Sequence, residues 1–181
     1  KSTWLAKRIQ NYNGNAIVYK HFTNIDDAAF NFLTTKTIKN IRQGVPPGEN
    51  VKCKIGGFES SDYIAFLDWV KKNFRNGMLV IDDATIFERD RLSKQMNFLL
   101  TMKRHLGIDI FLVYHGLTLL PIEQFLLCKA IVLFNTTDNL SYKAKKTPKY
   151  RELENGIILA RNNFRSGDKK KKYSPVIIDL R

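Results

Sequence analysis

The run Met78-Leu79-Val80-Ile81-Asp82-Asp83 decides the fold class of this chain. Four successive apolar residues are typical of a central strand that is buried on both faces of a parallel sheet. Two acids directly after such a strand lie at the carboxyl edge of the sheet, where α/β proteins bind their ligands. There one carboxylate can hold a hydrated magnesium ion, and the other can orient or deprotonate a water molecule. The plain alternative is an Asp-Asp turn after a strand.

Strands and helices alternate on both sides of this run. Apolar patterns predict further strands at 16–19, around 51–55, at 109–114 and at 130–134. Other segments have helical character, at 4–9, 26–42, 60–74, 90–106 and 122–127. The alternation predicts an α/β fold with a mostly parallel sheet.

The C-terminal part of the sequence has a different pattern. Residues 156–161 and 174–180 are strand-like, and turn-forming residues lie between them. We therefore expect an antiparallel hairpin with a basic tip. In the core of the protein we expect four large aromatic side chains, which are Trp4, Phe66, Trp69 and Phe98.

Length and charge limit the kinds of protein that this chain can be. Its 181 residues predict a single domain, 1–181, with a core at 1–140 and a basic linker and hairpin at 141–181. The formal net charge is +13, and residues 141–181 supply +8 of it with 12 basic and 4 acidic side chains. This charge indicates a polyanionic partner. Cys53 and Cys128 are too few for a disulfide scaffold, and we expect no secretion signal or membrane span, which indicates an intracellular protein.

The sequence opens on Lys1-Ser2-Thr3, which runs directly into a helical segment. In a P-loop, backbone amides at a helix N-terminus cradle the phosphates, a lysine reaches the β and γ oxygens, and a serine binds Mg²⁺. Only the end of that motif is present, and alone it carries little information. Here, however, a strand, a helix and the Asp82-Asp83 strand follow it in the order that a P-loop ATPase requires.

The stretch Leu79 to Ala84, together with Arg104 to His115, resembles the FtsK/HerA superfamily of P-loop ATPases, which have a RecA/ASCE-like fold. Within it, the pattern is similar to small viral genome-packaging ATPases of icosahedral phages and to the Zot-like morphogenesis ATPases of filamentous phages. The resemblance covers about residues 1–135. It implies a five-strand order with the Asp82 strand beside the strand that ends at His115. It also implies a first strand and phosphate loop upstream of Lys1.

The resemblance implies a role for each matching residue of the site. Lys1 would be the phosphate lysine, Ser2 the Mg²⁺ ligand, and Thr3 would assist at the start of the helix. Asp82 would be the Walker B acid, which helps to hold Mg²⁺. Asp83 would be the water activator at a position where the family more often has Glu, one methylene longer.

The family also implies a sensor and an arginine finger. His115 would occupy the sensor position, where the family often has Gln, and a histidine can donate a hydrogen bond to phosphate. Arg104 is the first candidate for a finger that reaches the nucleotide of a neighbouring subunit, with Arg89 and Arg91 as alternatives. A surface or DNA-facing arginine is the plain alternative at each position.

The function implied is an ATP-driven nucleic-acid translocase, which uses ATP and Mg²⁺ and packages a viral genome. We expect a homo-oligomeric ring of six subunits on double-stranded DNA, in the host cytoplasm or the virion, in contact with capsid or portal vertex proteins. Sequence-independent affinity for DNA would come from phosphate contacts. The candidate basic residues are Lys36, Lys39, Arg42, Arg165, Lys169, Lys170, Lys171 and Lys172. A solvated charged surface is the plain alternative for them.

Other functions stay open. A Zot-like export ATPase would use the same sites. A nucleotide-binding assembly subunit with weak hydrolysis would explain Asp83 in place of Glu. A nucleotide kinase would need an arginine-rich lid, which we do not find in the sequence. A DNA-binding module without ATP would require both acidic and Lys-Ser-Thr motifs to be coincidences.

Overall fold

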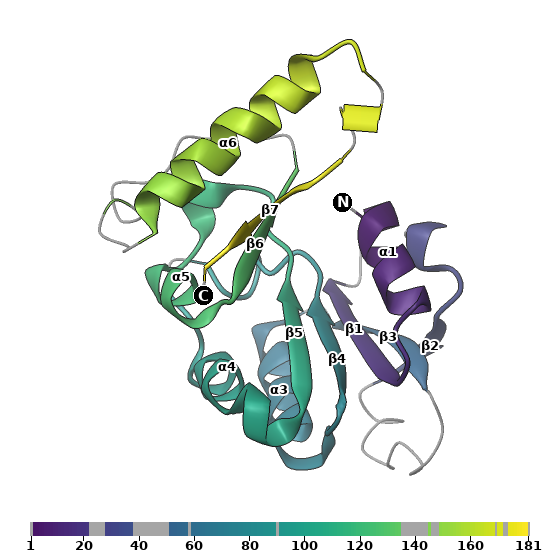
Figure 1. Cartoon of the computed structure of the whole chain (residues 1–181). Helices are drawn as coiled ribbons and strands as arrows, with labels where there is room; N and C mark the ends of the chain where they lie inside the picture. The colour runs from purple at the N-terminus through teal and green to yellow at the C-terminus, as the bar shows by residue number, and fades with distance from the viewer. Residues whose placement is uncertain are drawn as a thin grey trace. The chain divides into compact units, whose positions relative to one another are not determined.

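The computed structural model describes residues 2–21, 28–37, 51–57, 59–89, 91–134, 145, 149–168, 170–171 and 174–180. These residues form two compact units (Figure 1). The first unit comprises residues 1–88 and 93–114, and the second comprises 89–92 and 115–181. The predicted division of one domain near residue 140 stays a prediction.

A five-stranded, fully parallel sheet forms the centre of the first unit, in the order β2-β3-β1-β4-β5. The strands are β1 (Asn15–His21), β2 (Thr34–Lys36), β3 (Lys52–Gly57), β4 (Gly77–Ile81) and β5 (Ile108–Leu112). All five residues of β4 are buried, as predicted. In β5 only Ile108 is buried, because among the described strands β5 has a neighbour on one side only. The predicted strand at 109–114 is therefore present, but shorter and less buried than expected.

Helices cover both faces of this sheet. Helix α1 (Ser2–Gln10) packs Leu5, Ala6 and Ile9 against Val18 and Val80 and their neighbours on one face. Helices α3 (Ser60–Asn73) and α4 (Lys94–Leu106) cover the other face. Since successive residues of a strand point to opposite faces, Val18 and Lys20 of β1 point toward α1, whereas Tyr19 points toward α3. Each helix was predicted, although α4 begins four residues later than expected.

The start and end of α4 have clear local causes. The Ser93 hydroxyl caps the helix by accepting a hydrogen bond from the Met96 amide at 3.1 Å. At the other end Gly107 adopts φ 65°, the left-handed conformation that glycine adopts without strain. The Gly77 amide then donates to the Gly107 carbonyl at 3.1 Å, so the helix ends beside the first residue of β4.

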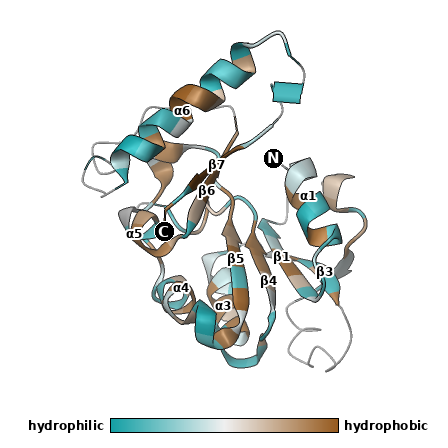
Figure 2. Ribbon diagram, viewed as in Figure 1, coloured by the Kyte–Doolittle hydropathy of each residue, from teal (hydrophilic) through white to brown (hydrophobic). Residues whose placement is uncertain are grey.

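The second unit contains a two-stranded antiparallel sheet, β6 (Ala130–Leu133) with β7 (Val176–Asp179), in the register Leu133↔Val176. Helix α6 (Tyr150–Arg165) packs on it, and Figure 2 shows hydrophobic residues on both strands and in the middle turns of α6. Helix α5 (Ile122–Leu127) and the short helix η3 (Leu117–Leu119) complete the unit.

The predicted C-terminal hairpin is only half right. The antiparallel pair exists, but β7 pairs with β6, and residues 156–161 are helical. The buried positions of α6 are Leu153, Gly156, Ile157 and Ala160, which follow helical spacing. Gly156 lets the helix approach β7, because a Cβ at this position would overlap the Ile178 side chain.

The predicted helix at 26–42 is wrong where the structure describes it. Residues 28–37 contain a single 3-10 turn, η2 (Ala28–Phe30), and then strand β2. The β-branched pair Thr34-Thr35 favours the extended conformation. The rest of the predicted helix lies outside the described residues.

The predicted aromatic core is mostly correct. Phe66 and Trp69 are buried, and Trp4 is partly buried against the cluster beneath α1. The prediction that Phe98 is buried is wrong, because this side chain is 37% exposed. The Lys71 ammonium lies 4.4 Å from its ring centre. Among the described residues, no helix combines the length and the apolarity that crossing a bilayer requires.

Candidate functional site

The Asp82-Asp83 turn directly follows β4, at the carboxyl edge of the sheet, as predicted. The Asp82 amide donates to the Tyr19 carbonyl of β1 at 2.9 Å, and the Ala84 amide donates to the Val113 carbonyl after β5 at 2.8 Å. The turn is therefore held from both sides. Asp83 adopts φ 54°, a left-handed conformation that costs a non-glycine residue about 1 kcal/mol and that Asp tolerates better than most.

A buried lysine contacts the first of the two acids. Lys20 Nζ lies 2.5 Å from Asp82 Oδ2, and the two side chains are 1% and 15% exposed. The Lys20 ammonium also lies 4.3 Å from the ring centre of Phe30. This ion pair was not predicted, because the expected strand ended at Tyr19. The sequence feature that could have indicated the pair is Lys20, directly after the buried run 16–19, because a lysine buried at that place needs a carboxylate partner.

A second buried charge fixes the loop that follows the turn. Glu88 accepts hydrogen bonds from the Tyr63 hydroxyl at 2.7 Å, the Ser93 amide at 2.6 Å and the Ser93 hydroxyl at 2.7 Å. Burial raises the pKa of the Glu88 carboxyl, although these hydrogen bonds act to lower it. Glu88 thus ties the loop after Asp83 to α3 and to the first turn of α4. Nothing in the sequence pattern predicted this role.

Aromatic side chains support the turn on the α3 face. Tyr63 stacks on Phe87 with ring centres 4.5 Å apart, and Tyr19 stacks on Phe66 at 4.7 Å. The Tyr19 hydroxyl is buried and has no hydrogen-bond partner within the described part of the chain. Burial raises the pKa of Tyr19, so this side chain stays neutral. The site therefore has a rigid, apolar support behind it.

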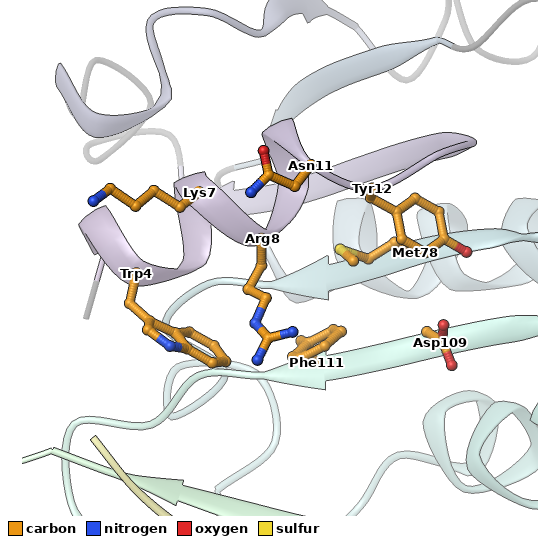
Figure 3. Close-up of a pocket in the computed structure, with 8 residues that line it drawn as sticks. All are labelled: Trp4, Lys7, Arg8, Asn11, Tyr12, Met78, Asp109 and Phe111. Carbon is orange, nitrogen blue, oxygen red and sulfur yellow. The ribbon is translucent and has the colours of Figure 1, made fainter. Parts of the chain in front are cut away.

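The start of α1 lies at the same edge of the sheet as Asp82. Helix α1 leads through a short turn into the amino end of β1, so its own N-terminus points toward the carboxyl ends of the strands. In Figure 3, Tyr12 is near Met78, at the start of β4, whereas Trp4 lies farther along in the direction of the strands. Ser2 and Thr3 form the first turn of this helix and are partly or fully exposed. Lys1 lies outside the described residues.

The four catalytic candidates other than the carboxylates lie in different places. Arg104 is exposed in the last turn of α4, beside the amino ends of β4 and β5 and therefore at the opposite edge from Asp82. Arg89 and Arg91 are exposed residues of the second unit, and so is His115. Within the first unit, Asp82, Asp83 and the start of α1 lie at the same edge of the sheet, and Arg104 lies at the opposite edge.

The DNA-contact candidates are only partly described. Lys36 is partly buried at the end of β2, and Arg165 is exposed at the end of α6. Lys170 and Lys171 are exposed in a helical turn. Lys39, Arg42, Lys169 and Lys172 lie outside the described residues.

A pocket of about 470 Å³ lies between α1 and the strands β4 and β5 (Figure 3). It is lined by Trp4, Lys7, Arg8, Asn11, Tyr12, Met78, Asp109 and Phe111. The Arg8 guanidinium lies 5.1 Å from the ring centre of Trp4. Neither Asp82 nor Lys20 lines this pocket, so it is distinct from the acidic turn.

The oxygen atoms near the acidic turn could hold Mg²⁺ only together with further oxygen atoms from a bound molecule. Asp82, Asp83 and Ser2 offer hard oxygen atoms, which Mg²⁺ prefers. Among the residues that the structure describes, no three His, Cys, Asp or Glu side chains come together as a metal site. A magnesium ion here would therefore need water and phosphate oxygens to complete its coordination, as is usual for nucleotide-bound Mg²⁺.

The fold is similar to that of a viral packaging NTPase of known structure. The genome packaging NTPase B204 of Sulfolobus turreted icosahedral virus 2, in complex with sulfate, superposes with a TM-score of 0.66 over 99% of this chain and 86% of that chain, at 15% identity. The same protein in complex with ATP-gammaS gives a TM-score of 0.58 over 98% of this chain and 83% of that chain, again at 15% identity. The predicted resemblance is thus confirmed at the level of the fold. No protein-family model matches the sequence, and no curated protein matches it either.

Proposed function

We propose that this chain is a Mg²⁺-dependent ATPase that drives a viral genome into a capsid. The observation that carries the proposal is the acidic pair Asp82-Asp83 at the tip of the buried central strand β4, at the same edge as the start of α1. The N-terminus of a helix attracts phosphate through its free amides and its dipole. The fold shared with a packaging NTPase supports this choice among P-loop functions.

Each residue at this edge has a chemical task in the proposal. Lys1 and the amides at the start of α1 would bind phosphate oxygens, and the Ser2 hydroxyl and the Asp82 carboxylate would hold a magnesium ion. A bound magnesium ion would offset the negative charge that develops on the transferring phosphoryl group. Asp83 accepts a hydrogen bond from the attacking water and so orients it. Its left-handed backbone, held by the flanking hydrogen bonds of Asp82 and Ala84, fixes the direction of that side chain.

The proposal includes a ring of identical subunits, with six as the expected number. A finger arginine acts on the neighbour's nucleotide, so its distance from the Asp82 of its own chain is no obstacle. Arg104 at the amino edge of the sheet suits such a role, and Arg89, Arg91 and the sensor His115 are further candidates from the second unit. The excess positive charge would bind the phosphates of double-stranded DNA without regard to sequence. Capsid or portal proteins, in the host cytoplasm or virion, are the proposed further partners.

A nucleotide-binding assembly subunit with weak hydrolysis is the second candidate, and a Zot-like export ATPase would share its site. Two features favour weak hydrolysis: Lys20 occupies one oxygen of Asp82, and the Asp83 side chain is shorter than the usual glutamate. Both features would slow the reaction without preventing nucleotide binding.

Hydrolysis by the full-length protein separates these possibilities. We expect Asp82→Asn to lower the rate of ATP hydrolysis by at least about 100-fold, because the neutral amide holds the ion poorly. Asp109→Asn is the matched control, since Asp109 is an exposed aspartate at the start of β5, at the opposite edge. If Asp82→Asn retains the wild-type rate, the proposed function is wrong. If both proteins bind ATP and neither hydrolyses it, the assembly subunit is the better description.

A further inference from the structure

Lys20 is a buried charged group that contacts the proposed site directly. Its side chain is 1% exposed and ends 2.5 Å from Asp82 Oδ2. Moving an ammonium group out of water is costly unless it is paired, so a lysine at this depth is held by its partners. Asp82 remains 15% exposed and is therefore accessible from the solvent side.

The geometry of the sheet builds this contact. Tyr19 of β1 pairs with Ile81 of β4 in a parallel register, so the next residues of the two strands, Lys20 and Asp82, lie side by side. Their side chains emerge on the α1 face, where the ring of Phe30 covers the Lys20 ammonium at 4.3 Å. The position of the lysine is thus fixed by backbone pairing and by packing, not only by its charge.

The pair leaves Asp82 with one oxygen already occupied. Lys20 takes Oδ2, and a carboxylate has a second oxygen that can accept the water shell of a metal ion. The fixed positive charge beside the carboxylate also repels a free divalent cation. A nucleotide would bring enough negative charge to offset that repulsion.

From these contacts we propose that Lys20 is a positioning residue that holds Asp82 in place and prevents divalent cations from binding there without a nucleotide. This inference rests on the proposed function, because it concerns the same acid. Its consequence is that the ion enters only together with ATP, so that a vacant subunit is not occupied by metal alone.

Binding of Mn²⁺, which replaces Mg²⁺ and is visible by electron paramagnetic resonance, tests the inference without any hydrolysis. The full-length protein is titrated with Mn²⁺ in the absence of nucleotide. Lys20→Met removes the charge and keeps an unbranched apolar side chain against Phe30. We expect this variant to bind free Mn²⁺ at least about tenfold more tightly than the wild type. The repulsion between an ammonium and a divalent ion about 5 Å apart is large enough for such a change even at the dielectric constant of water. Lys20→Gln should show a similar gain, and it provides the answer if Lys20→Met does not fold.

Three controls make the result specific. Lys20→Arg keeps the charge and should bind Mn²⁺ as weakly as the wild type. Lys54→Met removes another buried lysine, which lies beside Val18 in the next strand, and should leave the affinity within about twofold. The double variant with Lys20→Met and Asp82→Asn should lose the gain.

Two results would overturn the inference. One is an unchanged or weaker Mn²⁺ affinity in both neutral variants, and the other is an equal gain in Lys54→Met. Failure of the proposed function is recognised separately, as wild-type protein that does not bind ATP or as hydrolysis that survives Asp82→Asn.

Discussion

Glu88 provides the most direct test of how the loop after the acidic turn is held. Replacing it with alanine leaves three donors without their acceptor, namely the Tyr63 hydroxyl, the Ser93 amide and the Ser93 hydroxyl. A buried donor without a partner costs about 1–3 kcal/mol, and the deleted side chain leaves a cavity. Release of the buried carboxylate, whose pKa is raised by burial, offsets part of that cost. We expect Glu88→Ala to lower the free energy of unfolding by about 3 kcal/mol.

The assay is urea unfolding at neutral pH, followed by the fluorescence of the buried Trp69. Glu88→Gln keeps one acceptor oxygen but turns an NH₂ group toward a donor, and it should cost about 1–2 kcal/mol. Glu152→Gln is the control, because its pairing with Lys149 is at the surface and 3.7 Å long, and it should change stability by less than about 0.5 kcal/mol. A change of less than about 1 kcal/mol in Glu88→Ala would refute the role of Glu88 as the anchor of this loop.

Three further predictions concern the same region. Because burial raises the pKa of Glu88, the folded protein binds a proton there more readily than the unfolded chain, and this proton-linked part of the stability is present at acidic pH and lost as pH rises through the folded-state pKa. The stability difference between wild type and Glu88→Gln should therefore be larger at acidic than at neutral pH, as measured by urea unfolding across pH. Gly57→Ala should destabilise the protein by about 1–3 kcal/mol, because the new Cβ would overlap the Tyr19 hydroxyl, and adding Tyr19→Phe should recover part of that loss in thermal unfolding. Asp83→Asn should leave the free energy of unfolding within about 0.5 kcal/mol, since Asn also tolerates the left-handed backbone, but lower ATP hydrolysis by at least about 100-fold, whereas Asp83→Ala should also lose about 1 kcal/mol of stability.

The elements that sequence predicts well are those with a local cause. The apolar run ending at Ile81 predicts a central strand because a strand buried on both faces needs no polar side, and β4 is such a strand. Gly107 predicts the end of α4 because it adopts the left-handed conformation there. The position of Asp82 and Asp83 at the carboxyl edge follows directly from that strand.

The elements that were predicted wrongly had two compatible patterns. Ile157-Ile158-Leu159 resembles a strand, yet the spacing of Leu153, Gly156, Ile157 and Ala160 is helical, and the packing of α6 on β6 and β7 decides between them. The contact of Lys20 with Asp82 joins residues 62 positions apart and depends on strand register. The contact of Glu88 with Tyr63 joins residues 25 positions apart and depends on helix packing. Such partners cannot be read from local spacing in a single sequence.

We propose above all that the acidic edge of this sheet hydrolyses ATP to move DNA. The most direct measurement is the steady-state rate of ATP hydrolysis by the full-length protein, with Mg²⁺, in the absence and presence of double-stranded DNA. We predict a rate that rises when DNA is added, that falls back when salt screens the phosphate contacts, and that is lost in Asp82→Asn. A rate that is unaffected by DNA at every salt concentration, or hydrolysis that persists in Asp82→Asn, would contradict the claim.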